Sequence, residues 1–224
     1  MGTVALVEDG QIRSEVGASV RAAHGETLLP HVRDTLRMAR VDLTDVDLFA
    51  VGLGPGSFTG LRIGVATAKG LALAGGQPLV GVCTLRTLAR GMPAVGGLCC
   101  PLLDAYKGEV YGAAYSWGEA AELRTEIEPF HGRPEAVLDR LRTAAGDLPI
   151  WVAGDGVSRY AEVFERLPTQ IRRAPGFCDA PRAACLAHEA ALLHATRGPD
   201  DLAALEPMYL RASDARLPST PQRR

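Results

Sequence analysis

The chain has 224 residues, of which 47% are hydrophobic and 22% charged, and its formal net charge is −2. This length and composition suit one large or two small globular domains with a full core. The near-neutral charge excludes a global basic field that would draw the protein onto nucleic acid. The five cysteines are an odd number without framework spacing and no signal peptide is recognised, so we expect reduced thiols and a cytoplasmic protein without a membrane segment.

Strands and helices are predicted to alternate along the chain. An Asp-Gly turn at 8–11 predicts that the chain opens with a β-hairpin. The next helix is amphipathic, and periodic apolar residues mark its buried side. The predicted elements of the first half are strands at 3–7 and 12–20, a helix at 23–40, a strand at 47–53, a helix at 58–74, a strand at 78–82 and a short helix from 84.

Residues 91–97 hold four glycine or proline residues in seven and form the best candidate for a linker. The sequence therefore predicts two α/β lobes, 1–97 and 98–212, followed by a flexible tail at 213–224. The predicted elements of the second half are strands at 98–105 and 109–116, a helix at 134–144, a strand at 149–153, helices at 157–166 and 183–196, and an extended segment at 207–211.

The predicted helix at 58–74 is apolar on nearly every side, and only Arg62, Thr67 and Lys69 interrupt it. Such a helix must be covered on all sides, in a core, in a subunit interface or in both. Small residues recur every four positions along one face and would let another helix approach closely. These residues are Gly60, Gly64, Ala68 and Ala72.

The glycine-rich turn before this helix resembles several phosphate-binding motifs and matches the spacing of none. Its backbone amides could hold an anion at the helix start, or Ser57 or Thr59 could cap the helix. Asp104 and Glu109 could likewise act in acid–base chemistry or frame a turn. The glycines at 154 and 156 form a second turn, which could bind an anion or be purely structural. The candidate anion or nucleotide contacts are Gly56, Ser57, Thr59, Asp104, Gly154 and Gly156.

Metal and catalytic patterns are missing from the sequence. None of the five histidines lies three or four residues from another, and there is no Cys-x-x-Cys pair. We therefore expect no metal site and no catalytic residue.

Several stretches together resemble the TsaB (YeaZ) family, and they cover most of the chain. The longest and most specific is Gly-Pro-Gly-Ser-Phe-Thr-Gly-Leu-Arg-Ile-Gly, which starts at Gly54. The supporting stretches are 24–30, 78–82, 103–111 and 207–211.

This resemblance implies two RNase H-like lobes of the acetate kinase, Hsp70 and actin superfamily. It also implies a non-catalytic subunit that binds and activates the TsaD transferase. With the ATPase TsaE, that complex installs N6-threonylcarbamoyladenosine at position 37 of tRNAs that read codons beginning with A. Contact with tRNA would come mainly through the complex, ATP or ADP would lie at its interface, and the chain alone would form a homodimer.

In this family the first two helices of the first lobe pack against the same helices of TsaD or of a second copy. Here these are the helices at 23–40 and 58–74. The implied interface residues are Leu29, Val32, Leu36, Gly60, Leu61, Gly64, Val65, Ala68 and Ala72. Bulky replacement of Gly64 is then expected to abolish pairing.

Two departures from the family pattern matter. Tyr106 stands where the family usually has arginine. The strand that normally opens the fold is also missing, so strands 2–8 and 47–53 would face a gap with unpaired backbone groups. We expect the true start to lie upstream or another segment to fill the gap.

Two rival functions remain open. The first is an ATP-hydrolysing member of the same superfamily that acts on its own and depends on Asp104 or Gly156. The second is a peptidase, for which the chain offers no pair of nucleophile and base.

Overall fold

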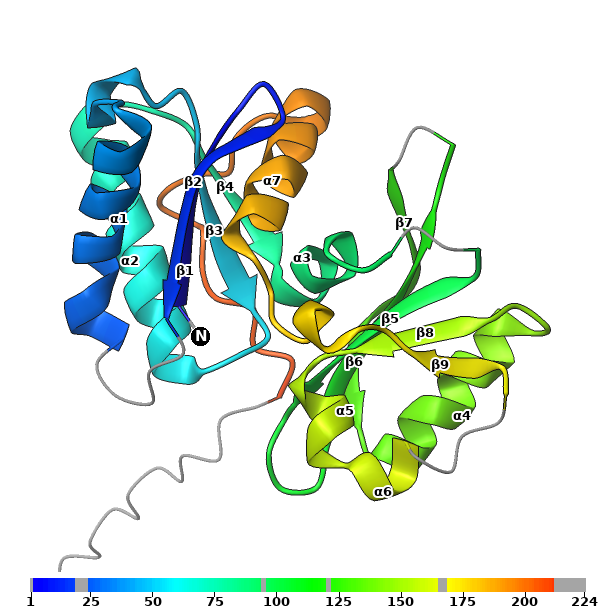
Figure 1. The fold of residues 1–224 in the computed structure, drawn as a ribbon. Coiled ribbons are helices and arrows are strands. Elements are labelled where there is room, and N and C mark those ends of the chain that lie inside the picture. Colours follow the sequence, from blue (N-terminus) through cyan, green and yellow to red (C-terminus); the bar gives the residue numbers. More distant parts are fainter. Residues whose placement is uncertain (1, 19–23, 94–95, 120–121, 165–168, 212–224) are drawn as a thin grey trace, which may run out of the picture.

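A computed structural model describes residues 2–18, 24–93, 96–119, 122–164 and 169–211 (Figure 1). Two α/β lobes lie side by side, and the chain crosses between them more than once. In the part of the chain that is described, no helix is both long and apolar enough to cross a membrane. The residues expected to form the tail, 213–224, lie outside the described part, as do residues 94 and 95 of the expected linker.

The first lobe is built from two strand pairs between helices. The hairpin turn adopts positive φ at both Asp9 and Gly10, which confirms the predicted Asp-Gly turn. The antiparallel pair is β1–β2 and the parallel pair is β3–β4. The elements are β1 (Gly2–Glu8), β2 (Gln11–Ala18), α1 (His24–Ala39), the 3-10 turn Leu43–Asp45, β3 (Phe49–Gly54), α2 (Phe58–Gly75), β4 (Leu79–Cys83) and α3 (Thr84–Arg90).

These two strand pairs do not join into one sheet. Within the described residues β1 is bonded only to β2, and β3 only to β4. The far edge of β4 is covered instead, because the Gly81 amide donates to the Asp200 carboxylate (2.7 Å) and the Asp200 amide donates to the Leu79 carbonyl (2.9 Å). In the described residues, β1 and β3 therefore each have a hydrogen-bonded neighbour on one side only.

Helix α2 packs along β3, and its ends are well defined. The Ser57 hydroxyl accepts a hydrogen bond from the Gly60 amide (3.4 Å), and Gly76 ends the helix with a left-handed φ of 73°. In Figure 1, α1 and α2 lie on one side of the strands and α7 on the other. The strands of this lobe are therefore covered on both faces.

The second lobe has one five-stranded sheet with the order β7–β6–β5–β8–β9. Strands β8 and β9 run parallel to β5, whereas β6 and β7 form an antiparallel meander beside it. The elements are β5 (Leu98–Asp104), β6 (Val110–Trp117), β7 (Leu123–Gly132), α4 (Pro134–Ala145), β8 (Ile150–Ala153), α5 (Asp155–Arg159), α6 (Ala161–Phe164), β9 (Ile171–Arg173), the 3-10 turn Gly176–Cys178 and α7 (Ala183–Arg197).

Three expectations about the second half need correction. Strands β7 and β9 were not predicted, because β7 is polar and largely exposed along its length and β9 has only three residues. The helix expected at 157–166 is instead two short helices that break at Tyr160, whose φ and ψ are −116° and 42°.

The third correction concerns the end of the second lobe. Helix α7 packs on β1, β3 and β4 of the first lobe, where Leu186 and Ala190 contact Val80 and Val82. Leu205 then joins the core around Val51. The expected second lobe, 98–212, therefore includes a final helix and segment that belong by packing to the first lobe, because α7 covers apolar strand residues there.

Candidate functional site

The stripe of small residues on α2 runs from half-buried positions at Gly60 and Gly64 to a fully buried one at Ala72, which corrects part of the expected interface. A Cβ on Gly64 would lie 3.8 Å from Cγ2 of Val51 on β3, and Ala72 is fully buried. Val65 is 5% exposed, and Ala68 packs against the same core. The small residues allow α2 to lie close to β3. Val65 and Ala72 are buried and not available to a partner, whereas Gly64 and Ala68 are half-buried.

A second series of residues on α2 points outward. Arg62, Ala66, Gly70 and Leu73 are all exposed, and we name them the outer α2 face. Leu73 is 67% exposed, and a Cβ on Gly70 would meet no atom within 4 Å. An exposed glycine inside a helix costs about 0.5–1 kcal/mol relative to alanine, and no contact within the described residues explains it.

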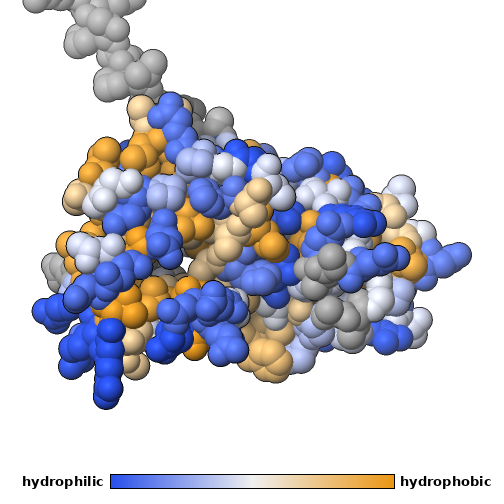
Figure 2. All heavy atoms as spheres, turned by 90° about the horizontal axis from the view of Figure 1, so that it is seen from above, coloured by the Kyte–Doolittle hydropathy of each residue, from blue (hydrophilic) through white to orange (hydrophobic). Residues whose placement is uncertain are grey.

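Helix α1 lies beside α2 and adds apolar surface to it. Leu29 is 55% exposed and Met38 is 61% exposed, but nine residues apart in one helix they lie on opposite sides of α1. Val32 and Leu36 are half-buried. Seen from above, hydrophobic residues gather among hydrophilic ones on the left side of the molecule, which is the side of α1 and α2 (Figure 2). Of the expected interface residues, Leu29 is the one that is prominently exposed, and Gly60 and Leu61 are half-buried.

An arginine held by two aromatic rings stands at the start of the outer α2 face. The Arg62 guanidinium carbon lies 3.9 Å from the Phe58 ring centroid, and Arg62 Nε donates to the Tyr209 hydroxyl (3.1 Å). The two ring centroids are 5.5 Å apart. Sequence reasoning missed this cluster, because Tyr209 is 147 residues from Arg62 in the chain.

The glycine turn before α2 has a structural role in the geometry that is observed. Ser57 caps the helix, while Gly56 and Thr59 are exposed beside it. A Cβ on Gly54, whose φ is 109°, would lie 3.0 Å from the Met208 carbonyl oxygen. The glycine at 54 is therefore required by its backbone conformation and by the close approach of the C-terminal segment.

The second group of candidate anion contacts lies at the ends of β5 and β8. A Cβ on Gly154 would lie 2.1 Å, and one on Gly156 2.9 Å, from the Leu102 carbonyl oxygen, so both glycines allow a close backbone approach. Asp155 accepts a hydrogen bond from the Asp104 amide (2.9 Å). Burial raises the pKa of Asp155, and the nearby Asp104 charge adds to that rise.

Asp104 itself organises the turn that follows β5. Its carboxylate accepts hydrogen bonds from the Tyr106 amide (2.9 Å) and the Tyr160 hydroxyl (3.1 Å). Tyr106, Lys107 and Gly108 all have positive φ, and Tyr106 is 66% exposed at the tip. These contacts support the structural interpretation of Asp104, and they place Tyr106 in solvent.

Glu109 follows this turn and is tied to the C-terminal segment. It lies 3.2 Å from His131 Nδ1 and 3.9 Å from Arg211 Nη1, and that Arg211 nitrogen also donates to the Ala105 carbonyl (2.9 Å). Because the Met208 amide donates to the Leu53 carbonyl (2.7 Å), the segment around Tyr209 joins the end of β3 to the turn after β5. The segment around Tyr209 thus connects the two groups of candidate anion contacts, one at the turn before α2 and the other at the ends of β5 and β8.

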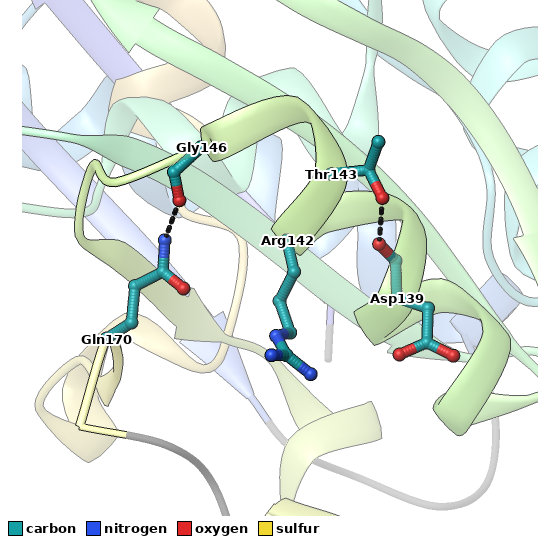
Figure 3. Close-up of a pocket in the computed structure, with 5 residues that line it drawn as sticks. All are labelled: Asp139, Arg142, Thr143, Gly146 and Gln170. Atoms are coloured by element: carbon teal, nitrogen blue, oxygen red, sulfur yellow. Dashed lines mark hydrogen bonds between the residues drawn. The ribbon is translucent and has the colours of Figure 1, made fainter.

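The remaining features offer little chemistry. Among the described residues, no three His, Cys, Asp or Glu side chains are placed to hold a metal ion. A shallow hollow on the second lobe is lined by Asp139, Arg142, Thr143, Gly146 and Gln170 (Figure 3). Its polar groups serve the end of α4: the Thr143 hydroxyl donates to the Asp139 carbonyl (2.9 Å), and the Gln170 amide nitrogen donates to the Gly146 carbonyl (2.5 Å) and the Leu148 carbonyl (2.9 Å).

Comparisons with known proteins point to one family. A family model described as "TsaD: tRNA N6-adenosine threonylcarbamoyltransferase" matches residues 16–216. The tRNA threonylcarbamoyladenosine biosynthesis protein TsaB of Escherichia coli (strain K12) is 39% identical over 152 residues, which span 67% of this chain and 64% of that protein. The protein of the same name from Bacillus subtilis (strain 168) is 28% identical over 95% of this chain and 90% of its own length.

A solved structure gives the same answer at the level of the fold. The solved structure described as YeaZ from Pseudomonas aeruginosa aligns with a TM-score of 0.78 at 29% identity, and the alignment covers 93% of each chain. The fold is thus the two-lobed α/β fold that the resemblance implied. The chain belongs to the TsaB (YeaZ) family.

Proposed function

We propose that this protein is a non-catalytic subunit that binds and activates a TsaD-type transferase for N6-threonylcarbamoylation of adenosine 37 in tRNA. The observation that carries the proposal is the exposed apolar surface on the neighbouring helices α1 and α2, where Leu29 and Leu73 are each more than half exposed. Family membership supports it, since the relatives from E. coli and B. subtilis are named tRNA threonylcarbamoyladenosine biosynthesis proteins.

The shape of this surface suits a helical partner. Ala66 and Gly70 are small and exposed, so a facing helix can approach their backbone closely. Leu73 and Leu29 supply side chains that lose contact with water on association. We infer that the partner binds at the outer α2 face together with Leu29 of α1, beside the half-buried stripe that contains Gly64.

A supporting role fits the chemistry of the described residues better than a catalytic one does. The carboxylates of Asp104 and Asp155 and the glycines at 154 and 156 are engaged in turns of the second lobe. We infer that the subunit acts by holding the transferase in a competent conformation, with a TsaE-type ATPase as a further component. ATP or ADP would bind at the interface of the complex, and tRNA would be contacted mainly through it.

The test is reconstitution with purified components. Modified tRNA is measured with the TsaD-type transferase, the TsaE-type ATPase and the threonylcarbamoyl-AMP donor, with and without this chain. We expect modification to require the chain and to be lost with Leu73→Glu, while Leu148→Glu, at a leucine that is 53% exposed on the other lobe, retains it. Modification of equal extent without the chain would contradict the proposal.

A separate measurement addresses the rival ATPase. The isolated chain is expected to show no ATP turnover above the background of the buffer. Turnover that is lost with Asp104→Asn would favour the rival instead.

A further inference from the structure

The guanidinium of Arg62 is held in one orientation while most of its hydrogen-bonding capacity is unused. Stacking on Phe58 fixes its plane, and the bond from Nε to Tyr209 fixes its rotation in that plane. Within the described residues the two terminal nitrogens have no hydrogen-bond partner, and no carboxylate lies within 4.0 Å of them. Arginine forms its strongest contacts when such a planar edge meets a carboxylate or phosphate in bidentate fashion.

The position of the cluster indicates the kind of ligand. Arg62 is the first residue of the outer α2 face, so its charge stands beside the apolar positions Ala66, Gly70 and Leu73. Phe58 and Tyr209 are 49% and 47% exposed, and they present half-open rings next to that charge. Aromatic residues and arginine beside an apolar surface are typical of the residues that dominate protein–protein binding energy.

The surroundings argue against a nucleic-acid phosphate as the ligand. Binding to nucleic acid gains most of its affinity from several cations acting together. The segment that carries Tyr209 continues to the turn after β5, where the arginines are paired with carboxylates: Arg159 lies 4.0 Å from Asp104, and Arg211 lies 3.9 Å from Glu109. A single carboxylate on a protein surface needs only one arginine edge.

We propose that Arg62 receives a carboxylate side chain, Asp or Glu, of the transferase that docks on the outer α2 face. This inference rests on the proposed function, because the same surface binds the same partner. The carboxylate would meet the terminal edge of the guanidinium, and Tyr209 would act as a positioning residue that holds this edge toward the partner. A guanidinium that is already oriented loses little conformational entropy on binding.

The experiment measures the affinity of the full chain for the purified TsaD-type transferase by calorimetry. Arg62→Gln is expected to weaken binding by about tenfold or more, as for a charged hydrogen bond at an interface. Arg62→Lys should recover only part of the affinity, because lysine keeps the charge without the planar fork. Tyr209→Phe, which keeps the ring and removes the hydroxyl, should weaken binding by roughly threefold to tenfold.

Arg140→Gln is the matched control. Arg140 also stacks on a phenylalanine, with 4.0 Å from its guanidinium carbon to the Phe130 ring centroid, but it lies on α4 of the other lobe. The Arg140→Gln substitution should leave the affinity for the transferase unchanged. Unfolding midpoints of all variants establish that they fold.

The outcomes separate this inference from the proposed function. If the unmodified chain does not bind the transferase, both are overturned. If the chain binds and Arg62→Gln binds equally well, this inference alone is overturned. If Arg62→Gln weakens only the binding of tRNA to the complex, the ligand is a phosphate and the carboxylate proposal is wrong. A charge-reversal experiment tests the carboxylate proposal directly. Arg62→Glu should abolish binding to the transferase, and an Asp→Arg or Glu→Arg change in the transferase should restore that binding.

Discussion

Arg86 donates through Nε to the fully buried carboxylate of Glu189 and through Nη2 to the carbonyl of Leu123 (2.9 Å). Arg90 also pairs with Glu189. Glu189 therefore ties the two lobes together: α3, which carries both arginines, packs chiefly on the sheet of the second lobe, whereas α7, which carries Glu189, packs on the strands of the first. The side chains of Arg86 and Arg90 are 21% and 7% exposed, so water can replace little of this interaction.

Glu189→Gln should reduce the free energy of unfolding by about 3–5 kcal/mol, because it leaves two arginines buried without a counter-charge. Urea unfolding followed by circular dichroism measures the change. The control is Glu122→Gln, which breaks an ion pair with Arg124 whose side chains are 62% and 50% exposed, and which should cost less than about 1 kcal/mol. Equal effects of the two substitutions would show that the buried triad has no special role.

Gly70→Ala is expected to stabilise the isolated chain by about 0.5–1 kcal/mol, since a Cβ there meets open space inside a helix. Gly64→Leu should instead destabilise the fold, because residue 64 faces Val51 in the core. Thermal unfolding of both variants measures the difference. The stability of Gly64→Leu has to be measured beside its pairing with the transferase, so that loss of pairing is not confused with damage to the lobe.

Leu73→Glu should abolish association with the transferase without loss of stability. The leucine is 67% exposed, so the folded chain loses almost no burial, whereas the complex would have to bury a carboxylate. Size-exclusion chromatography of the mixed proteins measures association, and the same column reports whether the chain alone forms a homodimer through this face. A complex that persists with Leu73→Glu would place the interface elsewhere.

Asp200 should make the first lobe sensitive to acid. Its pKa is lowered chiefly by the hydrogen bond from Arg197, with the Gly81 amide adding to the effect and burial opposing it. A carboxylate with a lowered folded pKa stabilises fully above its unfolded pKa, near 3.8, and loses that contribution as the pH falls through the folded value. Asp200→Asn should therefore cost about 1 kcal/mol at neutral pH and progressively less below about pH 4. The control is Asp147→Asn, at an exposed carboxylate, which should change the free energy of unfolding little at neutral pH and equally little at acidic pH.

Amide hydrogen exchange should reveal the open edge of β3. The Phe49 amide donates to the Pro78 carbonyl, and peptide directions alternate along a strand, so Ala50 and Gly52 point away from β4. Their amides should exchange faster than those of Val51 and Val80. A chain extended at its N-terminus by an apolar strand should slow exchange at Ala50 and Gly52 if that strand fills the gap. Strong protection in the present chain would show that the edge is already closed.

The sequence by itself determined the fold class, the hairpin turn, most helices and strands of the first lobe, and the family. These follow from local signals: Asp9-Gly10 encodes its own turn, apolar periodicity marks each helix, and the stretch from Gly54 is distinctive without any partner. The divided sheet also followed from comparing the order of the strands with the expected fold.

Only the tertiary structure decided which face of α2 is free. Both faces of that helix carry small residues, so composition cannot distinguish Gly64 against Val51 from Gly70 in the open. The same holds for contacts between residues far apart in the chain, since Arg62 meets Tyr209 and Arg86 meets Glu189 only after α7 and the C-terminal segment return to the first lobe. Local periodicity indicates that a helix has a buried face. The packing of distant segments determines which segment covers that face and which residues of the helix remain exposed.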